Sequence, residues 1–531
     1  MYQLSPLSEQ IARRADSHNR IINTRTYREQ MLADPHRPTW HFAIPDDNGI
    51  PGDTNGAFFA DGRYHLMYLY RNSATNGFHW GHISSIDLLH WRHHPDAIGV
   101  EADDDGCNSG GAFVDDDGTA YLTFWKFVSR SGRDHGGIAM ACARPPYNVW
   151  ERMKPIAIEG DKPWGVKDLE VDGKIEHIGC ADPSNIWKYN GMYYMQTGNL
   201  CVLSKYGRAE DADPHYRGDW VDLFRSKDLK TWEYVHRFYE NPYRVNAVNE
   251  NDWPDRSEDD MCPSFLPLFD RSGNPTGKWL QLFISHNKGT QYYIGTLSED
   301  GETFMPEKHE RFSWNDSACF APEALIDDKN RQIVWCWMRD DRLNEISRFG
   351  WSGVYAFPRQ VWLEDGELHM APVEELARLQ YNAQSLGTAA AGEIVPVKNG
   401  ESFRMTAVIE PGEAKKVGFS VRGSADGAEK TLIYADLERG KLVFDATKSG
   451  SDGWTIVEEA PFELNAGEAL TLNILVDKSV VEVYANDRQA IARRIYPTNP
   501  EESLTVRALD TNAGAVVTRL DVWEISPANL Y

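Results

Sequence analysis

Acidic residues recur at one position of a segment that the sequence repeats five times. Aligned on the start of the first strand, the five copies give one column of residues: Asp53, Asn108, Asp182, Cys262 and Ala321. Two residues further along, on the same face of the strand, they give a second column: Asn55, Gly110, Ser184, Ser264 and Glu323. A run of three acids, Glu258 to Asp260, comes just before the fourth copy. If the strand starts converge, carboxylates from distant parts of the chain meet in one pocket.

Carboxylates that share a pocket shift each other's pKa, and such an arrangement is costly unless it does chemistry. The reaction that needs such a set is glycoside cleavage, in which one carboxylate is the nucleophile and a second group of raised pKa donates a proton. The alternative is structural, because in a chain with 80 Asp and Glu residues many acids belong to Asx turns and solvated loops. The residues alone leave both interpretations open.

The repeated segment itself predicts the elements that would position these carboxylates. Each copy has a first strand, a turn with Asp, Asn or Gly, and a strand dense in aromatic residues; the copies cover residues 53–70, 108–125, 182–198, 262–286 and 321–338. A single sheet of this kind cannot bury both faces, so the repeat indicates a β-propeller of five blades over residues 38–375. An ordinary sandwich with coincidental hairpins is the alternative.

The remaining segments predict smaller elements on either side of the propeller. Residues 7–32 are expected to form a helix capped by Ser8 and ended by Pro35 and Pro38, within an N-terminal helical extension at 1–37. The polar, Ala-rich stretch 376–395 is expected to be a linker. Residues 396–531 alternate with period two, which predicts an antiparallel β-sandwich. The expected fold class is therefore all-β.

Composition and net charge indicate which classes of partner, and which cellular compartment, to expect. The net charge of −25 repels phosphate backbones and anionic lipids, so we expect neither nucleic acid nor membrane as a partner. The seven Cys residues are odd in number and form no CxxC pair, which favours free thiols in a reducing compartment. Because no signal peptide or membrane-spanning run is visible, we expect a cytoplasmic location.

Several motifs, taken together, resemble those of glycoside hydrolase family 32, the β-fructofuranosidases that include invertases, inulinases and levanases. The opening motif of that family resembles WHFAIPDDNGIPGDTNGAFFADGRYHLMYLYR (40–71), and its Arg-Asp-Pro strand resembles CADPSNIWKYNGMYYM (180–195). WGHISSIDLLHW (80–91) and CNSGGAFVDDDGTAYLTF (107–124) are similar to its next two motifs, and LNILVDKSVVEVYANDRQAIARRIYP (472–497) to its C-terminal sandwich. The resemblance covers about 40–531. It implies retaining hydrolysis of terminal β-D-fructofuranosyl groups of sucrose or fructans through a fructosyl-enzyme intermediate, with no cofactor and no metal.

The resemblance also implies roles for individual residues. Asp53 matches the nucleophile of the family, and Asp182 matches its transition-state stabiliser. Asn55, Trp80 and Ser109 fall at substrate-binding positions, although for Trp80 a buried place inside a blade is the alternative.

Three positions depart from the family pattern. Ala181 replaces the Arg before Asp-Pro, Gly52 replaces the Asn before the nucleophile, and Met261 stands where the family has its acid/base Glu. Methionine cannot transfer a proton, so another acid must serve. Glu323, Asp259 and Asp260 are the candidates, and their positions in the sequence leave the choice among them open.

Other functions and sites remain open at this stage. The chain could transfer fructosyl groups to fructans, cleave another furanoside such as an arabinofuranoside, or bind sugar without catalysis, and homo-oligomerisation is open. His90, His93 and His94 are expected to be surface residues and not a metal site. The acidic run 101–105 is expected to be a solvated loop and not a calcium site.

Overall fold

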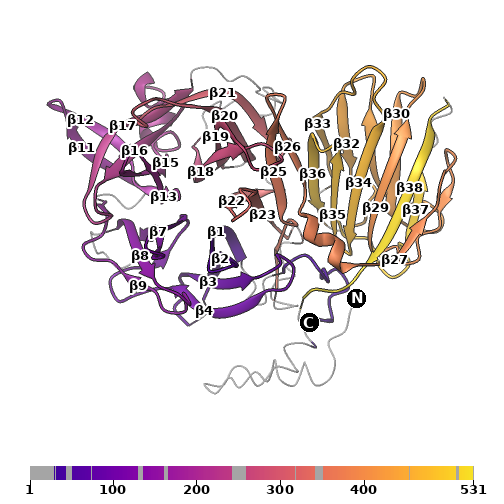
Figure 1. The fold of residues 1–531 in the computed structure, drawn as a ribbon, viewed down its shortest axis with the longest axis horizontal. Coiled ribbons are helices and arrows are strands. Elements are labelled where there is room, and N and C mark those ends of the chain that lie inside the picture. Colours follow the sequence, from indigo (N-terminus) through magenta and orange to yellow (C-terminus); the bar gives the residue numbers. More distant parts are fainter. Residues whose placement is uncertain are drawn as a thin grey trace. The chain divides into compact units, whose positions relative to one another are not determined.

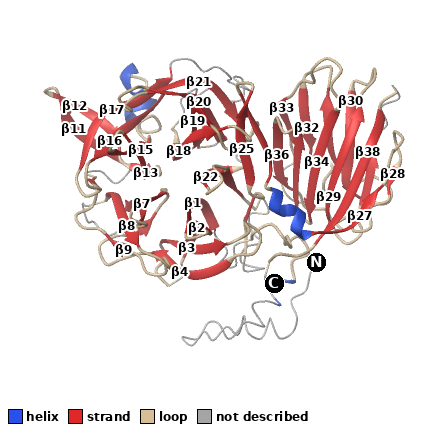
Figure 2. Cartoon of the chain, viewed as in Figure 1, coloured by secondary structure: helices blue, strands red, loops and turns tan. Residues whose placement is uncertain are grey.

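A computed structural model describes most of the chain after residue 28. The described residues are 29, 32–43, 51–72, 74–128, 136–160, 165–241, 259–286, 288–316, 318–340, 342, 351–451, 453, 455–509 and 514–529. The chain forms two compact units, the first made of 1–50, 338–357 and 369–531 and the second of 51–337 and 358–368. Strands make up nearly all of the regular structure (Figure 2), as the sequence predicts.

The second unit contains five main sheets, each starting from an inner strand. The first sheet has β1 (Pro51–Ala60), β2 (Arg63–Arg71), β3 (Phe78–Ser85) and β4 (Arg92–Ile98). The second has β5 (Gly106–Cys107), β6 (Ala112–Val114), β7 (Ala120–Phe127), β8 (Gly137–Ala143), β9 (Glu151–Arg152) and β10 (Ile158–Glu159). The third has β13 (Ala181–Pro183), β14 (Trp187–Tyr189), β15 (Met192–Gly198), β16 (Asp219–Ser226) and β17 (Trp232–Asn241).

The last two sheets follow the same order. The fourth has β18 (Met261–Phe269), β19 (Pro275–Ser285), β20 (Gly289–Leu297) and β21 (Phe304–Arg311). The fifth has β22 (Phe320–Ile326), β23 (Gln332–Met338), β25 (Arg359–Glu364) and β26 (Glu367–Pro372). A separate hairpin of β11 (Val166–Val171) and β12 (Lys174–Gly179), the helix α3 (Lys205–Arg208) and the 3₁₀ helix η2 (Pro214–Tyr216) complete the unit.

The inner strands of the five sheets form a closed ring. β1 contacts β6, β7 contacts β13, β13 contacts β18, β18 contacts β22, and β22 contacts β1 again. Figure 1 shows these strands around one centre, with β4, β9, β17, β21 and β26 toward the outside. Apolar clusters fill the space between neighbouring sheets, because each sheet has two faces to bury. This is the β-propeller that the repeat predicts.

The backbone at the start of three inner strands is left-handed at non-glycine residues. φ is 36° at Asp182, 50° at Cys262 and 45° at Ala321, and each residue lies inside a register shift of the strand pairing. Such a bulge re-aims a side chain, and a left-handed conformation outside glycine costs energy that the surrounding structure must offset. Asp53 lies in a comparable shift between Pro51 and Thr54 of β1. The directions of the side chains in the first column of the repeat are therefore set by these bulges. The regular alternation of a strand does not set them.

The first unit is a sandwich of two six-stranded antiparallel sheets. One has β27 (Gln380–Ser385), β38 (Val516–Ile525), β29 (Ser402–Glu410), β34 (Leu470–Asp477), β35 (Val480–Ala485) and β36 (Gln489–Arg494) in that order. The other has β28 (Ile394–Val395), β37 (Thr505–Ala508), β30 (Lys416–Gly423), β31 (Thr431–Asp436), β32 (Lys441–Asp445) and β33 (Val457–Pro461). β24 (Val354–Tyr355) pairs with β23 in the fifth propeller sheet, and the 3₁₀ helix η3 (Glu374–Leu379) precedes β27.

The stretch expected as a linker, 376–395, contains the edge strands β27 and β28. β27 is polar and mostly exposed, so it lacks the alternation of apolar residues by which a strand is recognised. The expected helix at 7–32 lies almost entirely outside the described residues. Across the part of the chain that is described, no helix has the length and apolar character needed to span a bilayer.

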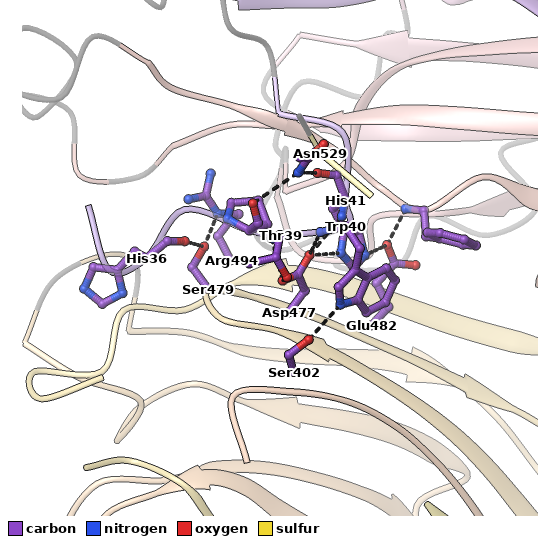
Figure 3. Close-up of polar contacts among 12 residues, drawn as sticks. His36, Thr39, Trp40, His41, Ser402, Asp477, Ser479, Glu482, Arg494 and Asn529 are labelled. Carbon is purple, nitrogen blue, oxygen red and sulfur yellow. Dashed lines mark hydrogen bonds and ion pairs between the residues drawn. The ribbon is translucent and has the colours of Figure 1, made fainter. Parts of the chain in front are cut away.

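The segment 34–43 is anchored within the first unit by a buried polar network (Figure 3). The Asp477 carboxylate accepts hydrogen bonds from the backbone N–H groups of Thr39, Trp40 and His41, from the Thr39 hydroxyl and from Nδ1 of His41, at 2.7–3.0 Å. Nε2 of His41 lies 3.3 Å from the Glu482 carboxylate. Both carboxylates are therefore well satisfied although they are buried.

Candidate active site

Asp53 and Asp182 come from different blades and meet at the thiol of Cys262. The Cys262 Sγ lies 3.5 Å from Oδ2 of each carboxylate and can donate its single S–H to either of them. The three residues belong to the first column of the repeat and lie at the starts of β1, β13 and β18. Three of the five positions expected to converge are thus brought together, over 209 residues of sequence between Asp53 and Cys262.

Two further predicted residues support the first strand. The Ser109 hydroxyl donates a hydrogen bond to Oδ2 of Asp53. Asn55 is buried, and its side chain donates to the backbone oxygen of Asp53 at 3.1 Å and accepts from the N–H of Gly110 at 3.2 Å. Ser109 therefore contacts the carboxylate directly, whereas Asn55 fixes the backbone that carries it.

The pKa values of the two carboxylates are both raised. Burial raises the pKa of Asp53, and the hydrogen bonds from Ser109 and Cys262 and the charge of His286 oppose this without cancelling it. Burial and the charge of Asp53 raise the pKa of Asp182 to about 7. Because the charge of Asp53 is one of the causes that raise the pKa of Asp182, Asp53 ionises before Asp182 as pH rises, which suits Asp53 as the nucleophile.

Trp80 lies in the hydrophobic core and not at the pocket. Its side chain is fully buried in the cluster between the first two blades, and its Nε1 donates to the backbone oxygen of Asn108 at 3.2 Å. A Cβ added to Gly56, which has φ of 52°, would meet the Trp80 ring at 3.0 Å. The substrate-binding prediction for Trp80 is corrected here: the ring packs under β1 and holds its backbone in place.

Two of the three departures from the family pattern lie together in one apolar cluster. Ala181 and Met261 are buried with Cys262 and Ala321, in a cluster that also contains Trp125 and Ile284. Positions that the resemblance assigns to a guanidinium and a carboxylate are therefore apolar in this chain. The proton donor must come from outside this cluster.

The three acids considered for that role have different surroundings. Glu323 is buried and accepts a hydrogen bond from the N–H of Ala57 at 2.9 Å, and burial raises its pKa well above its usual range. Asp260 is buried and accepts from the hydroxyl of Tyr239 at 2.9 Å. Asp259 is also buried, and its charge acts on Asp182.

His286 is a site residue that the sequence analysis missed. It follows β19 directly, its Nδ1 contacts Oδ2 of Asp259, and its charge acts on both Asp53 and Asp182. The signal was present in the strand register: Met261 pairs with Ile284 in an antiparallel ladder, so the residues two steps away, Asp259 and His286, face each other. A histidine in a loop after an aromatic strand gives no such signal alone.

One cluster outside the pocket differs from what the sequence suggests. His90 is exposed and His93 lies at the surface, as predicted, but His94 stacks on buried His82 with ring centroids 4.2 Å apart. Among the described residues, His65, His82 and His94 have nitrogens within 4.8 Å of one another, the spacing that a metal ion would need. In this structure Nδ1 of His65 is hydrogen-bonded to Nε2 of His82 at 2.9 Å, and both nitrogens of His94 contact Ser84 and Asn148.

The acidic run 101–105 is exposed at Glu101 and Asp103, as expected of a solvated loop, and cations contact three of its carboxylates. Arg152 contacts Asp104 at 2.5 Å and Glu101 at 3.3 Å, and Lys126 contacts Asp103 at 2.7 Å. These ion pairs occupy the carboxylates that a calcium site would need.

Comparisons with known proteins agree with the geometry. The model for the N-terminal domain of glycosyl hydrolases family 32 matches residues 41–372, and the model for the C-terminal domain of that family matches 373–524. Raffinose invertase of Escherichia coli is 27% identical over 92% of this chain and 95% of its own. Sucrose-6-phosphate hydrolase of Zymomonas mobilis is 26% identical over 94% of each chain. The crystal structure of fructan 1-exohydrolase IIa from Cichorium intybus superposes with a TM-score of 0.77 at 21% identity, covering 93% of this chain and 98% of that one.

Proposed function

The chain belongs to glycosyl hydrolase family 32, and we propose that it hydrolyses terminal β-D-fructofuranosyl groups of sucrose or fructans with Asp53 as the nucleophile. The observation that carries the assignment of residues is the meeting of Asp53 and Asp182 at the Cys262 thiol, at the starts of three inner strands. The names of the relatives, among them raffinose invertase, sucrose-6-phosphate hydrolase and levanase, support the class of substrate.

The reaction would proceed in two displacements, each with inversion at C2, from opposite faces of the sugar ring. Oδ of ionised Asp53 attacks the anomeric carbon C2, and the bond from C2 to the leaving oxygen breaks as that oxygen takes up a proton. Water then attacks C2 of the fructosyl ester, the bond to Asp53 breaks, and fructose leaves with retained configuration. Asp182 would contact the sugar hydroxyls, and its carboxylate form would accept hydrogen bonds from them as positive charge develops on the ring.

The test is fructose release by the parent and by the variant Asp53→Asn. Sucrose, sucrose 6-phosphate, raffinose, inulin and levan are the substrates, and chromatography measures the products. We expect the parent to release fructose from at least one of them and Asp53→Asn to lose at least about 10³-fold in kcat/KM. Asp61→Asn, a change at an exposed turn after β1, is the matched control and keeps parental activity.

Mass spectrometry of the quenched enzyme adds a second measurement. A fructosyl group on the peptide that contains Asp53 supports the covalent intermediate. An Asp53→Asn variant that cleaves fructosides as fast as the parent contradicts the assignment. Release of arabinose from arabinofuranosides, or transfer of fructosyl groups to sugar acceptors in place of water, would assign the same site to another furanoside or to a transferase.

A sugar-binding protein without catalysis is the second candidate, because Met261 and its apolar cluster occupy the place of the family's acid/base carboxylate. A parent protein that binds fructosides by calorimetry but releases no fructose from any of the five substrates would favour it.

A further inference from the structure

The proposed hydrolysis needs a proton donor, and the fourth blade holds a candidate one step outside Met261. β18 and β19 are antiparallel with Met261 opposite Ile284, which places Asp259 opposite His286 at the end of the ladder. Two hydrogen bonds from backbone N–H groups to side chains agree with this pairing. The Asp259 N–H donates to the Ser285 hydroxyl at 3.2 Å, and the His286 N–H donates to Oδ1 of Asp259 at 2.9 Å.

Asp259 orients the imidazole ring of His286. Oδ2 of Asp259 contacts Nδ1 of His286, and Oδ1 of Asp259 accepts a hydrogen bond from the His286 backbone N–H. The Asp259 carboxylate thus holds both the ring and the backbone of His286. The Asp259 side chain is 0% exposed, whereas that of His286 is 48% exposed. A carboxylate behind Nδ1 determines the tautomer and leaves Nε2 as the nitrogen that exchanges a proton with a ligand.

The charges around the ring favour the imidazolium form. Burial lowers the pKa of His286, but the hydrogen bond and charge of Asp259 and the charges of Asp182 and Asp53 outweigh it, so the pKa is raised. In return the charge of His286 partly opposes the rise in the pKa of Asp53 and of Asp182. The charged groups that act on His286 thus come from β1, β13 and the segment just before β18. The Phe320 ring on β22 packs edge-on to it, with ring centroids 6.3 Å apart.

The other acids are less well placed to reach a glycosidic oxygen. The carboxylate of Glu323 is buried against the backbone of β1, and that of Asp260 is buried against the Tyr239 hydroxyl. His286 is half exposed and interacts electrostatically with both Asp53 and Asp182. A donor to a leaving sugar must touch the substrate, which favours the exposed group.

We propose that His286, positioned by Asp259, is the acid/base residue of this site in place of the family's glutamate. The inference rests on the proposed function. As Asp53 forms its bond to C2, Nε2–H of His286 gives its proton to the leaving oxygen, whose bond to C2 breaks. In the second step the neutral Nε2 takes a proton from the water that attacks C2, and the bond from C2 to Asp53 breaks. The proton count and the charge of the enzyme return to their starting values.

The variant His286→Asn tests the donor with two leaving groups. Asparagine retains a donor toward Asp259 but cannot supply a proton to the substrate. We expect kcat/KM for sucrose to fall by about 10²–10⁴-fold, whereas kcat/KM for a nitrophenyl β-D-fructofuranoside, whose leaving group needs no proton, falls less than about tenfold. Equal losses on the two substrates, or a loss on sucrose below tenfold, would overturn the assignment.

A matched control comes from the first blade. His90 is also an exposed histidine paired with an aspartate, with Nδ1 2.9 Å from Oδ2 of Asp87 and a side chain 58% exposed. His90→Asn is therefore expected to keep parental activity on both substrates. A loss in His90→Asn like that in His286→Asn would show that the effect is one of stability and would count against the proposal.

Azide provides a readout that a folding defect would not give. Azide attacks C2 of the fructosyl enzyme without needing a base, so it should restore turnover of the nitrophenyl fructoside by His286→Asn and yield fructosyl azide of retained configuration. It should not restore turnover by Asp53→Asn. Failure of azide to accelerate the His286→Asn variant would contradict a role in the second step.

Asp259→Asn tests the positioning role through pH. Loss of the carboxylate removes the largest force that raises the pKa of His286, so the alkaline limb of kcat/KM should move to lower pH than in the parent. An unchanged alkaline limb would overturn the pairing. If the parent protein releases no fructose, the proposed function fails; if the parent is active and His286→Asn is too, only the present inference fails.

Discussion

Asp477 in the sandwich unit and Asp182 in the propeller unit are both buried carboxylates with a histidine nearby, yet their surroundings differ. Asp477 accepts five hydrogen bonds, all from residues 39–41 and one of them from the His41 ring (Figure 3). Burial raises its pKa, but the hydrogen bonds and the charge of His41 more than compensate, so the pKa is lowered. Asp182 accepts from a thiol at 3.5 Å, and its pKa is raised to about 7.

The difference separates a carboxylate that stabilises the fold from one that is kept reactive. Asp477 holds a chain segment in place, and its ionised form is the stable one. Asp182 and Asp53 are buried with raised pKa values, so their ionised forms cost stability above the usual pKa of an aspartate. The two histidines follow the same division: His41 is buried between Asp477 and Glu482, whereas His286 reaches solvent from Asp259.

The largest effect is expected for Asp477→Asn. The amide cannot accept all five hydrogen bonds, and His41 loses the partner that stabilises its charge. We expect the free energy of unfolding of the sandwich unit to fall by about 3–5 kcal/mol, as when one partner of a buried pair is removed. Urea unfolding followed by tryptophan fluorescence measures it; a change below 1 kcal/mol would show that the network contributes little.

The same substitution at Asp182 should act in the opposite direction. A carboxyl whose pKa is about 7 when folded and near 4 when unfolded loses protons first in the unfolded chain, so stability falls as pH rises from about 4 to about 7. Asp182→Asn removes this loss. We expect a gain of about 2–4 kcal/mol at pH 8 that shrinks toward zero near pH 4, together with a large loss of activity. Urea unfolding at both pH values checks this, and a destabilised variant at pH 8 would break the comparison.

The smallest effect is expected at Cys262, whose thiol joins the two catalytic candidates. Cys262→Ala removes a weak donor from Asp53 and Asp182, so the acidic limb of kcat/KM should move to higher pH by less than about one unit. Cys262→Ser places a stronger donor there and should move the limb to lower pH. Cys180→Ala, a buried thiol near the backbone oxygen of Ile158, is the control and leaves the limb in place. Equal shifts at both cysteines would argue against a specific role for Cys262.

Much of the fold could be predicted because its determinants are local. Alternating strands, turn residues and the five-fold repeat indicate propeller blades and a sandwich, and the structure has both. The column that contains Asp53, Asp182 and Cys262 follows from the same repeat, because equivalent positions in successive blades face the same centre. β27 was missed because an exposed edge strand has no apolar period.

The chemistry of the site depended on contacts that the sequence does not reveal. Trp80 and Ser109 lie in similar strand patterns, yet one is buried in the core and the other contacts Asp53. His286 became visible only once the register of β18 and β19 set it opposite Asp259. The order of residues along the chain thus determined which groups approach the centre of the propeller. Their burial, hydrogen-bond partners and protonation were decided by the tertiary structure, because these depend on neighbours that lie dozens to hundreds of residues away.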